Sequence, residues 1–322
     1  MNALLAAEGI TKAFGATQVL SGITLSVAPG EPVGLFGPNG SGKTTLVNIL
    51  SGLLPPDAGT VRFDGTDLTA LAPRPLRRMR RHFQIVFQDP TAALNPRMRV
   101  GTLVGEPLAI HRLATRADRP ARVAGLLRRV GLDPACSALY PQELSGGQRQ
   151  RVGIARAIAC GPRFLVADEP VSALDPPVQA QIVNLLLDLR DQMGLAYLLI
   201  AHDLRLVRHI ADRVAVLYAG RIVEEAPAAA LYAEPMHPYT RALLASTPGL
   251  RPGHPTPPGV SGEPASPSSR PPGCAFHPRC PRALPACASI VPVLLPAGEG
   301  RTVACHLVHP VEASETAVRA HA

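Results

Sequence analysis

Eight residues at 37–44, GPNGSGKT, have the composition of a loop that binds a phosphate chain. They fit the pattern G-x-x-x-x-G-K-[ST] at each fixed position, between an apolar run (31–37) and a helical pattern. Glycines allow backbone N–H groups to converge on phosphates at a helix N-terminus. We expect Lys43 to reach the β- and γ-phosphates of ATP, and Thr44 to ligate Mg²⁺. The predicted nucleotide-binding residues of this loop are Gly37, Pro38, Asn39, Gly40, Ser41, Gly42, Lys43, Thr44 and Thr45.

Two acids follow an apolar run in FLVADEP (164–170). Asp168 is expected at the end of a buried strand, where it would hold Mg²⁺ through water. Glu169 comes next and would polarise the water that attacks the γ-phosphate. An acid pair at a strand end is common in any α/β protein, so this motif gains its meaning from the phosphate loop that precedes it.

Two further polar residues end apolar runs. Gln88 follows FQIVF (83–87), and its amide could contact both Mg²⁺ and the attacking water, although an isolated glutamine is more often a surface residue. His202 follows LAYLLIA (195–201), and its imidazole could bind the γ-phosphate, with a structural role as the alternative. The predicted catalytic residues are Lys43, Gln88, Glu169 and His202, and the predicted Mg²⁺ ligands are Thr44, Gln88 and Asp168.

A second stretch suited to phosphate is ELSGGQRQRV, at 143–152. A serine and two glycines stand directly before a polar, basic helical pattern, as in a helix N-terminus that binds an anion. A complete phosphate loop already precedes this stretch in the chain. The sequence therefore raises the question of which nucleotide the second loop serves.

The elements that must position these residues are short apolar runs that alternate with helical patterns as far as about residue 230. This alternation predicts an α/β fold with a mostly parallel sheet. Residues 214–225 are typical of a hairpin that turns at Ala219–Gly220. The middle, about 91–160, is expected to be a helical insertion. The proline-rich stretch at about 251–272 predicts an extended linker.

The 322 residues carry a formal net charge of +8, and Lys12 and Lys43 are the only lysines. A basic balance fits nucleic acid or the anionic face of a membrane, but the chain has no Lys/Arg tail of the nucleic-acid type. The basic stretch at 74–83 is expected to be an exposed helix face. There is no signal-peptide pattern, and no apolar run reaches the roughly 18 residues needed to cross a bilayer. We therefore expect a soluble, cytoplasmic protein that binds no nucleic acid and reaches a membrane through partners.

Six motifs occur in the order and approximate spacing of a known family: GPNGSGKT, Gln88, LSGGQ (144–148), FLVADEP, SALD (172–175) and His202. Over residues 1–232 the chain resembles the ATPase domain of ABC transporters, which are P-loop NTPases with a helical subdomain. Phe14, in TKAFG, matches the aromatic that stacks on adenine in that family. From physics alone, a core phenylalanine on a first strand is the alternative.

The resemblance implies a head-to-tail dimer with a second ATPase subunit. The signature motif of one subunit would bind the γ-phosphate of the ATP that the other subunit holds, so ATP joins the dimer and hydrolysis releases it. The second phosphate loop then serves the partner's nucleotide. Asp175 matches the loop that crosses the dimer interface. The signature residues are Leu144, Ser145, Gly146, Gly147 and Gln148.

Four stretches resemble a narrower group, the ATPase subunits of oligopeptide, dipeptide and nickel importers: 88–98, 140–152, 237–248 and 273–280. The last two belong to a predicted C-terminal region, 233–322. The resemblance implies ATP-driven peptide import from the cytoplasmic side of the membrane, by a homo- or heterodimer of ATPases with two permease subunits and an external binding protein. Ala92–Pro96 would face a permease. Import of nickel or another small solute is the alternative, and a non-transport ABC ATPase is a more remote one.

Four cysteines cluster in the C-terminal region: Cys274, Cys280, Cys287 and Cys305. Zinc sites usually contain a closely spaced C-x2-4-C pair, which this segment lacks. Four thiolates can hold a [4Fe–4S] cluster, and the resemblance implies one, because that group's C-terminal cysteines fall at similar places. Four unligated thiols in a loop-rich appendage are the alternative. Cys136 and Cys160 are expected to be ordinary buried thiols.

Overall fold

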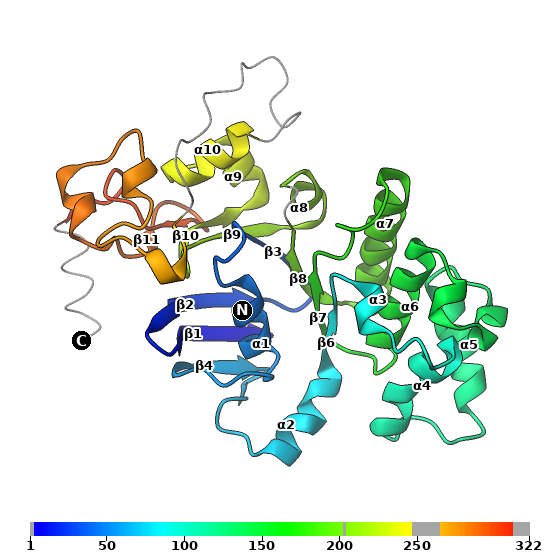
Figure 1. Ribbon diagram of the computed structural model, residues 1–322. Helices are drawn as coiled ribbons and strands as arrows, with labels where there is room; N and C mark the ends of the chain where they lie inside the picture. The colour runs from blue at the N-terminus through cyan, green and yellow to red at the C-terminus, as the bar shows by residue number, and fades with distance from the viewer. Residues whose placement is uncertain (1–2, 202–203, 247–264, 312–322) are drawn as a thin grey trace.

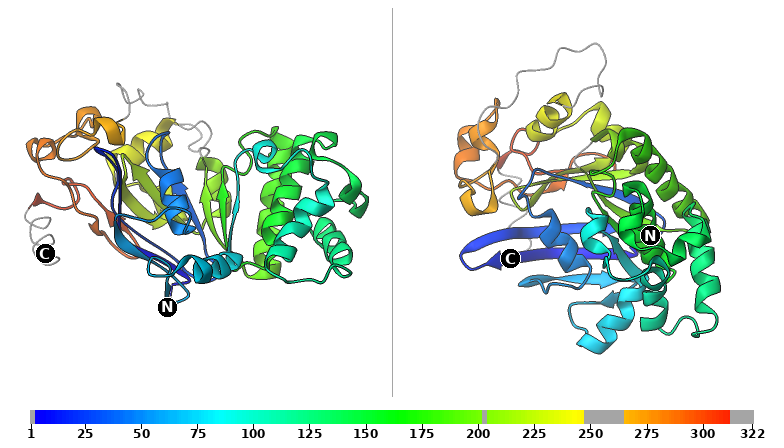
Figure 2. Two further views of the ribbon diagram at one scale, coloured as in Figure 1. Left: turned by 60° about the horizontal axis from the view of Figure 1, so that its bottom comes forward. Right: turned by 45° about the vertical axis from the view of Figure 1, so that its right-hand side comes forward.

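The computed structural model describes residues 3–201, 204–246 and 265–311 (Figure 1). Within these residues the chain forms one mixed sheet of eight strands and one antiparallel sheet of four. A group of helices lies at one end of the molecule and residues 265–311 lie at the other, with the sheets between them (Figure 2). In the described part of the chain, no helix combines the length and the apolar character needed to cross a membrane.

The eight-stranded sheet contains the elements that end in predicted site residues. Its strands, in spatial order, are β11 (Leu295–Pro296), β12 (Thr302–Val303), β10 (Arg221–Pro227), β9 (Arg213–Tyr218), β3 (Pro32–Phe36), β8 (Ala196–Ile200), β7 (Phe164–Asp168) and β6 (Phe83–Val86). The run from β9 to β6 is parallel, as predicted, because continuous apolar strands are buried on both faces. The strands from β9 to β11 pair antiparallel and extend the sheet.

The predicted hairpin at Ala219–Gly220 is confirmed. Tyr218 pairs with Arg221, and the two residues between them have positive φ angles of 45° and 78°. Two consecutive positive φ angles define the turn type whose twist matches a hairpin. A Cβ atom at Gly220 would lie 2.0 Å from the carbonyl oxygen of Val19, so this close approach requires glycine.

The antiparallel sheet was not predicted. Its strands are β2 (Thr17–Val27), β1 (Leu5–Phe14), β4 (Ala58–Phe63) and β5 (Thr66–Asp67). Side chains of β2 mostly alternate between buried and exposed, as expected for a sheet that buries one face. That face packs with helix α1 (Lys43–Leu50) and one side of the central sheet into a single apolar cluster.

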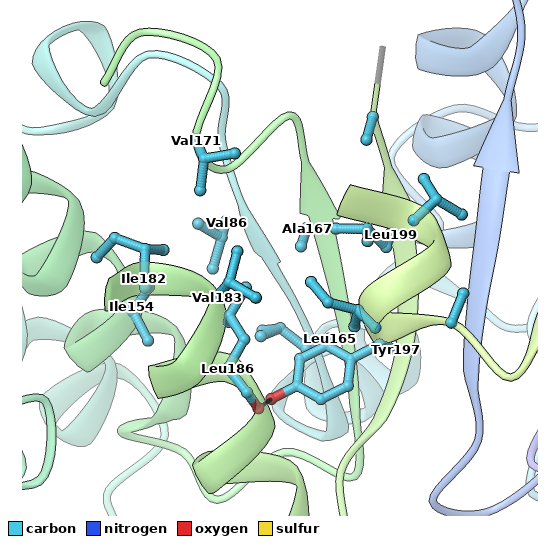
Figure 3. Packing of buried hydrophobic residues seen from close by; sticks show 14 of the residues in the cluster. Val86, Ile154, Leu165, Ala167, Val171, Ile182, Val183, Leu186, Tyr197 and Leu199 are labelled. Atoms are coloured by element: carbon cyan, nitrogen blue, oxygen red, sulfur yellow. Dashed lines mark hydrogen bonds between the residues drawn. The ribbon is translucent and has the colours of Figure 1, made fainter. Parts of the chain in front are cut away.

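The other side of the central sheet is covered by helices α6 (Gly146–Ile158) and α7 (Pro176–Met193), shown in Figure 3. Ile154 of α6 and Val183 and Leu186 of α7 belong to one buried apolar cluster with Leu165 and Tyr197 of the sheet. The Tyr197 hydroxyl donates a hydrogen bond to the Leu186 carbonyl over 3.0 Å. This packing fixes the N-termini of both helices relative to the strand that carries Asp168.

Residues 91–160, all of which the structure describes, contain helices and no strand. The helices of this part are α3 (Pro90–Ala93), α4 (Val100–Ile110), α5 (Arg119–Arg129) and α6, with short 3-10 turns at Pro134–Ala138 and Pro141–Glu143. Helix α2 (Pro73–Met79) precedes them and buries none of its residues, so the basic stretch at 74–83 begins as an exposed helix, as expected.

The chain beyond the β9–β10 hairpin folds back onto the central sheet. Helix α8 (Leu204–Ile210) precedes the hairpin. The elements that follow it are the helices α9 (Ala228–Ala233) and α10 (Pro238–Ser246) and the 3-10 turns η4 (Pro267–Ser269), η5 (His277–Arg279) and η6 (Pro285–Ala288). Of the predicted linker, residues 251–264 lie outside the described residues and 265–272 are described. Phe276 packs edge-on against Tyr218, with ring centroids 5.6 Å apart.

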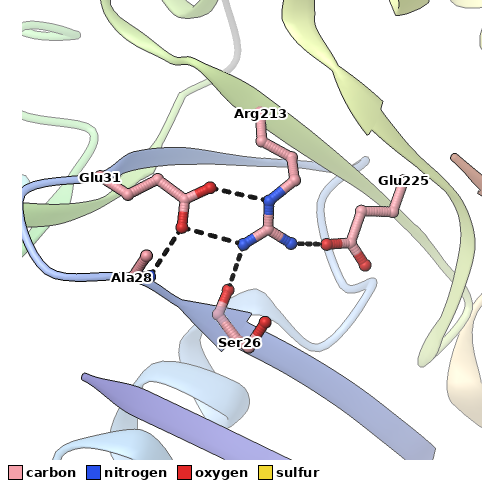
Figure 4. A network of polar contacts seen from close by, with 5 residues as sticks. All are labelled: Ser26, Ala28, Glu31, Arg213 and Glu225. Carbon is pink, nitrogen blue, oxygen red and sulfur yellow. Dashed lines mark hydrogen bonds and ion pairs between the residues drawn. The ribbon is translucent and has the colours of Figure 1, made fainter. Parts of the chain in front are cut away.

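Arg213 joins the two sheets at the start of β9 (Figure 4). Its guanidinium donates to both carboxylate oxygens of Glu31, over 2.8 and 3.1 Å, and to the carbonyl oxygen of Ser26. A third nitrogen pairs with Glu225. The Arg213 and Glu31 side chains are only 19% and 18% exposed, so this bidentate pair is partly shielded from water.

Candidate nucleotide-binding site

The phosphate loop connects β3 to α1 through a tight turn. Gly40 and Gly42 have φ angles of 74° and 104°, which favour glycine, and Gly42 caps the N-terminus of α1. A Cβ atom at Gly42 would lie 2.7 Å from Leu20 Cδ2, and one at Gly37 would lie 2.4 Å from the Leu217 carbonyl oxygen. The φ angles therefore favour glycine at positions 40 and 42, and the Leu217 backbone leaves no space for a side chain at position 37.

Lys43 begins helix α1 and its side chain folds back over the loop. Its Nζ donates to the carbonyl oxygens of Gly37 and Pro38, over 2.7 and 2.9 Å. Burial lowers the pKa of Lys43, while the nearby carboxylates of Glu169 and Asp168 act in the opposite direction. The buried Ser41 hydroxyl has no hydrogen-bond partner among the described residues. A loop with a buried ammonium and an unsatisfied hydroxyl can receive an anionic, oxygen-rich group such as a phosphate.

Glu169 follows β7 and is held in an uncommon backbone conformation. Its φ is 46°, which is costly for a residue with a side chain, and its N–H donates to the carbonyl oxygen of Ile200 over 2.9 Å. The side chain is 7% exposed. Gln88, after β6, donates from Nε2 to Glu169 Oε2 over 2.7 Å. The strained turn and the amide together aim one carboxylate at the end of the parallel sheet.

One cleft of about 560 Å³ unites the phosphate loop with the carboxyl ends of β6 and β7. The predicted residues that line it are Asn39, Gly40, Gly42, Lys43, Thr44, Thr45, Gln88, Asp168 and Glu169. Four further lining residues were missed: Thr17, Val19, Ser266 and Pro267. The alternation of buried and exposed positions in β2 is a sequence signal that could have predicted the strand that carries Thr17 and Val19. The sequence around Ser266 carries no such signal, because its Pro and Ser residues are typical of a linker.

Four of the predicted nucleotide-binding residues do not line this cleft: Phe14, Gly37, Pro38 and Ser41. Phe14 lies on the β1–β2 hairpin, where its Cα pairs with Thr17, and its ring is 51% exposed rather than part of a core. A half-exposed ring beside the cleft suits stacking better than core packing does. His202 lies outside the described residues.

The predicted signature residues form the start of α6, away from the cleft lining. Ser145 Oγ accepts a hydrogen bond from the Gln148 N–H, and the Gln148 side chain accepts one from the Ser145 N–H, which is a reciprocal capping box. A Cβ atom at Gly147 would lie 2.6 Å from Val178 Cγ1, so α6 and α7 approach closely there. Asp175 caps α7 by accepting from the Val178 N–H over 3.0 Å.

A second, more apolar groove of about 280 Å³ lies between the central sheet and the helical group. Phe87 and Ile110 line it and are 50% and 48% exposed, which is unusual for such large apolar side chains. Ala93 and Leu94, from the predicted 92–96 stretch, also line it. Gln150 of α6 reaches the same groove, is 1% exposed, and its Nε2 has no partner among the described residues.

The four C-terminal cysteines line one small, enclosed cavity of about 10 Å³. Burial raises the pKa of Cys274 to about 11, and it raises those of Cys280 and Cys305. Within the described residues, no group of three or more His, Cys, Asp or Glu side chains has the geometry of a metal site. The structure therefore does not support the iron–sulfur prediction.

The prediction that Cys136 and Cys160 are buried is wrong. Both thiols are free and partly exposed. Cys136 lies in a short 3-10 turn at the surface of the helical group, and Cys160 lies just beyond the last turn of α6.

Two family models match this chain. The model described as "ABC transporter" matches residues 20–172, which include the phosphate loop, Gln88, the signature residues and both acids. The model described as "Oligopeptide/dipeptide transporter, C-terminal region" matches residues 223–287. The two matches together span most of the described chain from β2 to η6.

Similar proteins are found among curated sequences and solved structures. A protein of Sinorhizobium fredii, named as a peptide ABC transporter ATP-binding protein, is 45% identical over 97% of this chain and 92% of its own length. A protein of Brucella abortus, named as a peptide import ATP-binding protein, is 52% identical over 88% of this chain and 85% of its own. The dimeric ATP-binding cassette MJ0796, in a post-hydrolysis state bound to ADP and Pi, is 31% identical with a TM-score of 0.64 over 70% of this chain and 98% of its own. CbiO1 from Clostridium perfringens, part of an ABC transporter complex, is 28% identical with a TM-score of 0.67 over 73% of this chain and 92% of its own.

Proposed function

The chain is an ATPase of the ABC transporter family with the C-terminal region of oligopeptide/dipeptide transporters, and from that premise we propose that it energises the import of di- or oligopeptides. The observation that carries the proposal is the cleft in which Lys43, Asp168 and the Gln88–Glu169 pair meet. These residues come from separate elements, yet they surround one space with the charges that phosphoryl transfer requires.

The polar residues of the cleft are proposed to bind the phosphates, activate water and hold Mg²⁺. Lys43 and the loop N–H groups bind the β- and γ-phosphates, and Glu169 accepts a proton from the attacking water. Gln88 orients Glu169 through the hydrogen bond between them. Thr44, Gln88 and Asp168 supply oxygen ligands for Mg²⁺, which when bound neutralises charge on the β- and γ-phosphates.

The signature residues are proposed to bind the ATP of a second ATPase subunit. The start of α6 presents an exposed Ser145 and two glycines at a helix N-terminus, where an anion is stabilised. Asp175, at the N-terminus of the neighbouring helix, would lie in the same interface. The dimeric state of the similar cassette MJ0796 supports this arrangement.

The apolar groove beside the helical group is proposed to receive a cytoplasmic helix of a permease. Its exposed Phe87 and Ile110 supply an apolar surface of the kind that marks a protein interface. The buried Gln150 amide can donate to a backbone carbonyl at the end of such a helix. This docking would hold the ATPase on the cytoplasmic side of the membrane, with two permeases and, through them, an external binding protein.

The four cysteines keep the number and kind of donors that a [4Fe–4S] cluster requires, and we retain the cluster only as a hypothesis. The cavity that they line, about 10 Å³, is near the volume that one water molecule needs, so the side chains would have to turn outward to hold a cluster. Anaerobic purification followed by iron and sulfide analysis tests it. A stoichiometric content that is lost in Cys274→Ser would support the cluster, and an iron-free protein would refute it.

The proposed function is tested by trapping the working complex. The Glu169→Gln variant is expressed in the native host, membranes are solubilised gently in ATP and Mg²⁺, and co-purifying proteins are identified by mass spectrometry. Recovery of two permeases, with or without a second ATPase subunit, would support transport and provide the complex for peptide-uptake assays. Recovery of ribosomal or DNA-associated proteins without a permease would contradict it. The Glu8→Gln variant, altered at an exposed residue of β1, is the control for non-specific capture.

A further inference from the structure

The C-terminal region supplies part of the wall of the nucleotide cleft. Ser266 and Pro267 line the cleft together with the phosphate loop, although about two hundred residues separate them in sequence. They belong to a short segment, residues 265–270, which we call the strap. The strap includes the η4 turn and packs on β2, the strand that also contributes Thr17 and Val19 to the cleft.

The strap is anchored at both ends. At its start, the Ala265 N–H donates to the Tyr218 hydroxyl over 3.0 Å. At its end, the Arg270 guanidinium donates to Ser21 Oγ over 2.6 Å and to the Gln18 carbonyl oxygen over 3.1 Å. Both anchors are specific polar contacts, so the strap has a defined position on the cleft and is not a passing linker.

The anchors also connect the strap to the phosphate loop. The Gly220 N–H donates to the Ser41 carbonyl oxygen over 2.9 Å, and the Gly220 carbonyl accepts from the Ser21 N–H over 2.9 Å. Ser21 in turn is the residue whose hydroxyl binds Arg270. A continuous set of hydrogen bonds therefore runs from the phosphate loop through the β9–β10 turn to the end of the strap.

We propose that the strap binds the nucleoside part of ATP, as an additional wall that the C-terminal region contributes. The inference rests on the proposed function, because it takes ATP as the occupant of the cleft. Two features favour the nucleoside over the phosphates. First, the strap lies on the side of the cleft formed by β2, next to the hairpin of Phe14. Second, the only cation of the strap, Arg270, is already bonded to Ser21 and Gln18 and so is not directed at a phosphate. Pro267 offers an apolar ring. The Ser266 hydroxyl pairs with Ser269 Oγ over 3.0 Å, and a hydroxyl oxygen, with two lone pairs and one proton, can form a further bond to a ribose hydroxyl.

Two variants test the strap. Arg270→Ala removes the anchor at the end of the strap, and Ser266→Trp keeps both anchors but places an indole in the wall of the cleft. We expect each to weaken ATP and ADP binding by about 3- to 10-fold, the effect of losing one or two modest contacts. Binding of inorganic tripolyphosphate, which has no nucleoside, should stay within about twofold of the wild type. Arg301→Ala, which removes a hydrogen bond to the Glu234 carbonyl oxygen and an ion pair with Glu224 elsewhere in the C-terminal region, is the matched control and should leave ATP affinity unchanged.

The measurement is isothermal titration calorimetry on the full chain, with thermal unfolding of each variant to verify that it is folded. Wild-type ATP affinity in both strap variants would overturn the inference. An equal loss of ATP and tripolyphosphate affinity would also overturn it, because the strap would then act on the phosphate loop. If the wild-type chain itself binds no ATP, the proposed function fails, which is a separate result.

Discussion

Gln88 Nε2 lies 2.7 Å from Glu169 Oε2, and this hydrogen bond joins residues that are 81 positions apart in the chain. The two residues follow neighbouring parallel strands, β6 and β7, so their side chains meet at one edge of the sheet. The contact fixes the carboxylate proposed to be the catalytic base. In the proposed mechanism, loss of the Gln88 amide would affect hydrolysis through the position of Glu169.

Replacement of Gln88 by Ala removes the donor that holds Glu169. A hydrogen bond to a charged group contributes about 1.5–3 kcal/mol, so we expect kcat for ATP hydrolysis to fall about 10- to 100-fold while ATP affinity changes little. Gln84→Ala is the matched control, because Gln84 lies on the same strand and donates to the Arg80 carbonyl instead. Equal rates in Gln88→Ala and Gln84→Ala would contradict the positioning role.

Replacement of Lys43 by Ala leaves the phosphate charge without its ammonium partner. We expect tripolyphosphate and ATP to bind at least about tenfold more weakly, since a charge-assisted contact is lost. Lys12→Ala controls for the removal of a lysine, because Lys12 pairs with Asp57 and does not line the cleft. Calorimetric titration with tripolyphosphate separates the two variants, and equal affinities would show that Lys43 does not bind phosphate.

His237 makes the stability of the C-terminal region depend on pH. The ring is 1% exposed, burial lowers its pKa from 6.5 to about 3, and its Nδ1 accepts a hydrogen bond from the Tyr239 N–H. The unfolded chain therefore takes up the proton first, so the stabilisation is complete above pH 6.5 and is lost as the pH falls toward 3. Between pH 7.5 and pH 5 we expect this group alone to cost about 2 kcal/mol of unfolding free energy.

Denaturant unfolding across that pH range measures the effect. His237→Asn keeps an acceptor near the Tyr239 N–H but cannot titrate, so the variant should show a correspondingly smaller loss of stability as the pH falls. His209→Asn, at an exposed position on α8, should leave the slope unchanged. If the unfolding free energy of His237→Asn fell with pH as steeply as that of the wild type, His237 would not be the group responsible.

Arg213 is expected to contribute strongly to the joining of the two sheets. Arg213→Ala leaves Glu31 and Glu225 partly buried without their shared cation, so we expect a loss of about 2–4 kcal/mol in unfolding free energy. Arg163→Ala breaks the exposed pair with Asp64, whose side chains are 47% and 57% exposed, and should cost at most about 1 kcal/mol. Chemical denaturation of both variants tests this difference, and similar losses would contradict the proposed role of Arg213.

The sequence predicted the parts of the cleft that depend on local pattern. The apolar run at 164–167 identified β7 and placed Asp168 at its end, and the parallel strands brought Gln88 close to Glu169. The glycine pattern located the phosphate loop to the residue. The phosphate loop and the end of β7 are each encoded within a few neighbouring residues. The proximity of Gln88 and Glu169 follows from the geometry of a parallel sheet.

The features that the sequence did not predict depend on contacts between distant residues. The alternation in β1 is interrupted by register shifts between Ala7 and Lys12, which hide the period of a strand. The sequence of the strap is typical of a linker because prolines and serines dominate it. The contact that fixes the strap joins Arg270 to Ser21, 249 residues away. A position set by such a contact has no local signal.

Glu169 is proposed to activate the water that hydrolyses ATP in this cleft. The most direct measurement is single-turnover hydrolysis of ATP by the wild type and by Glu169→Gln, with ATP affinity and oligomeric state determined on the same samples. For Glu169→Gln we expect unchanged ATP binding, hydrolysis slowed by about 10²- to 10⁴-fold, and accumulation of a dimer that depends on ATP. Near-normal turnover in Glu169→Gln would contradict the assignment of the base and, with it, the catalytic site described.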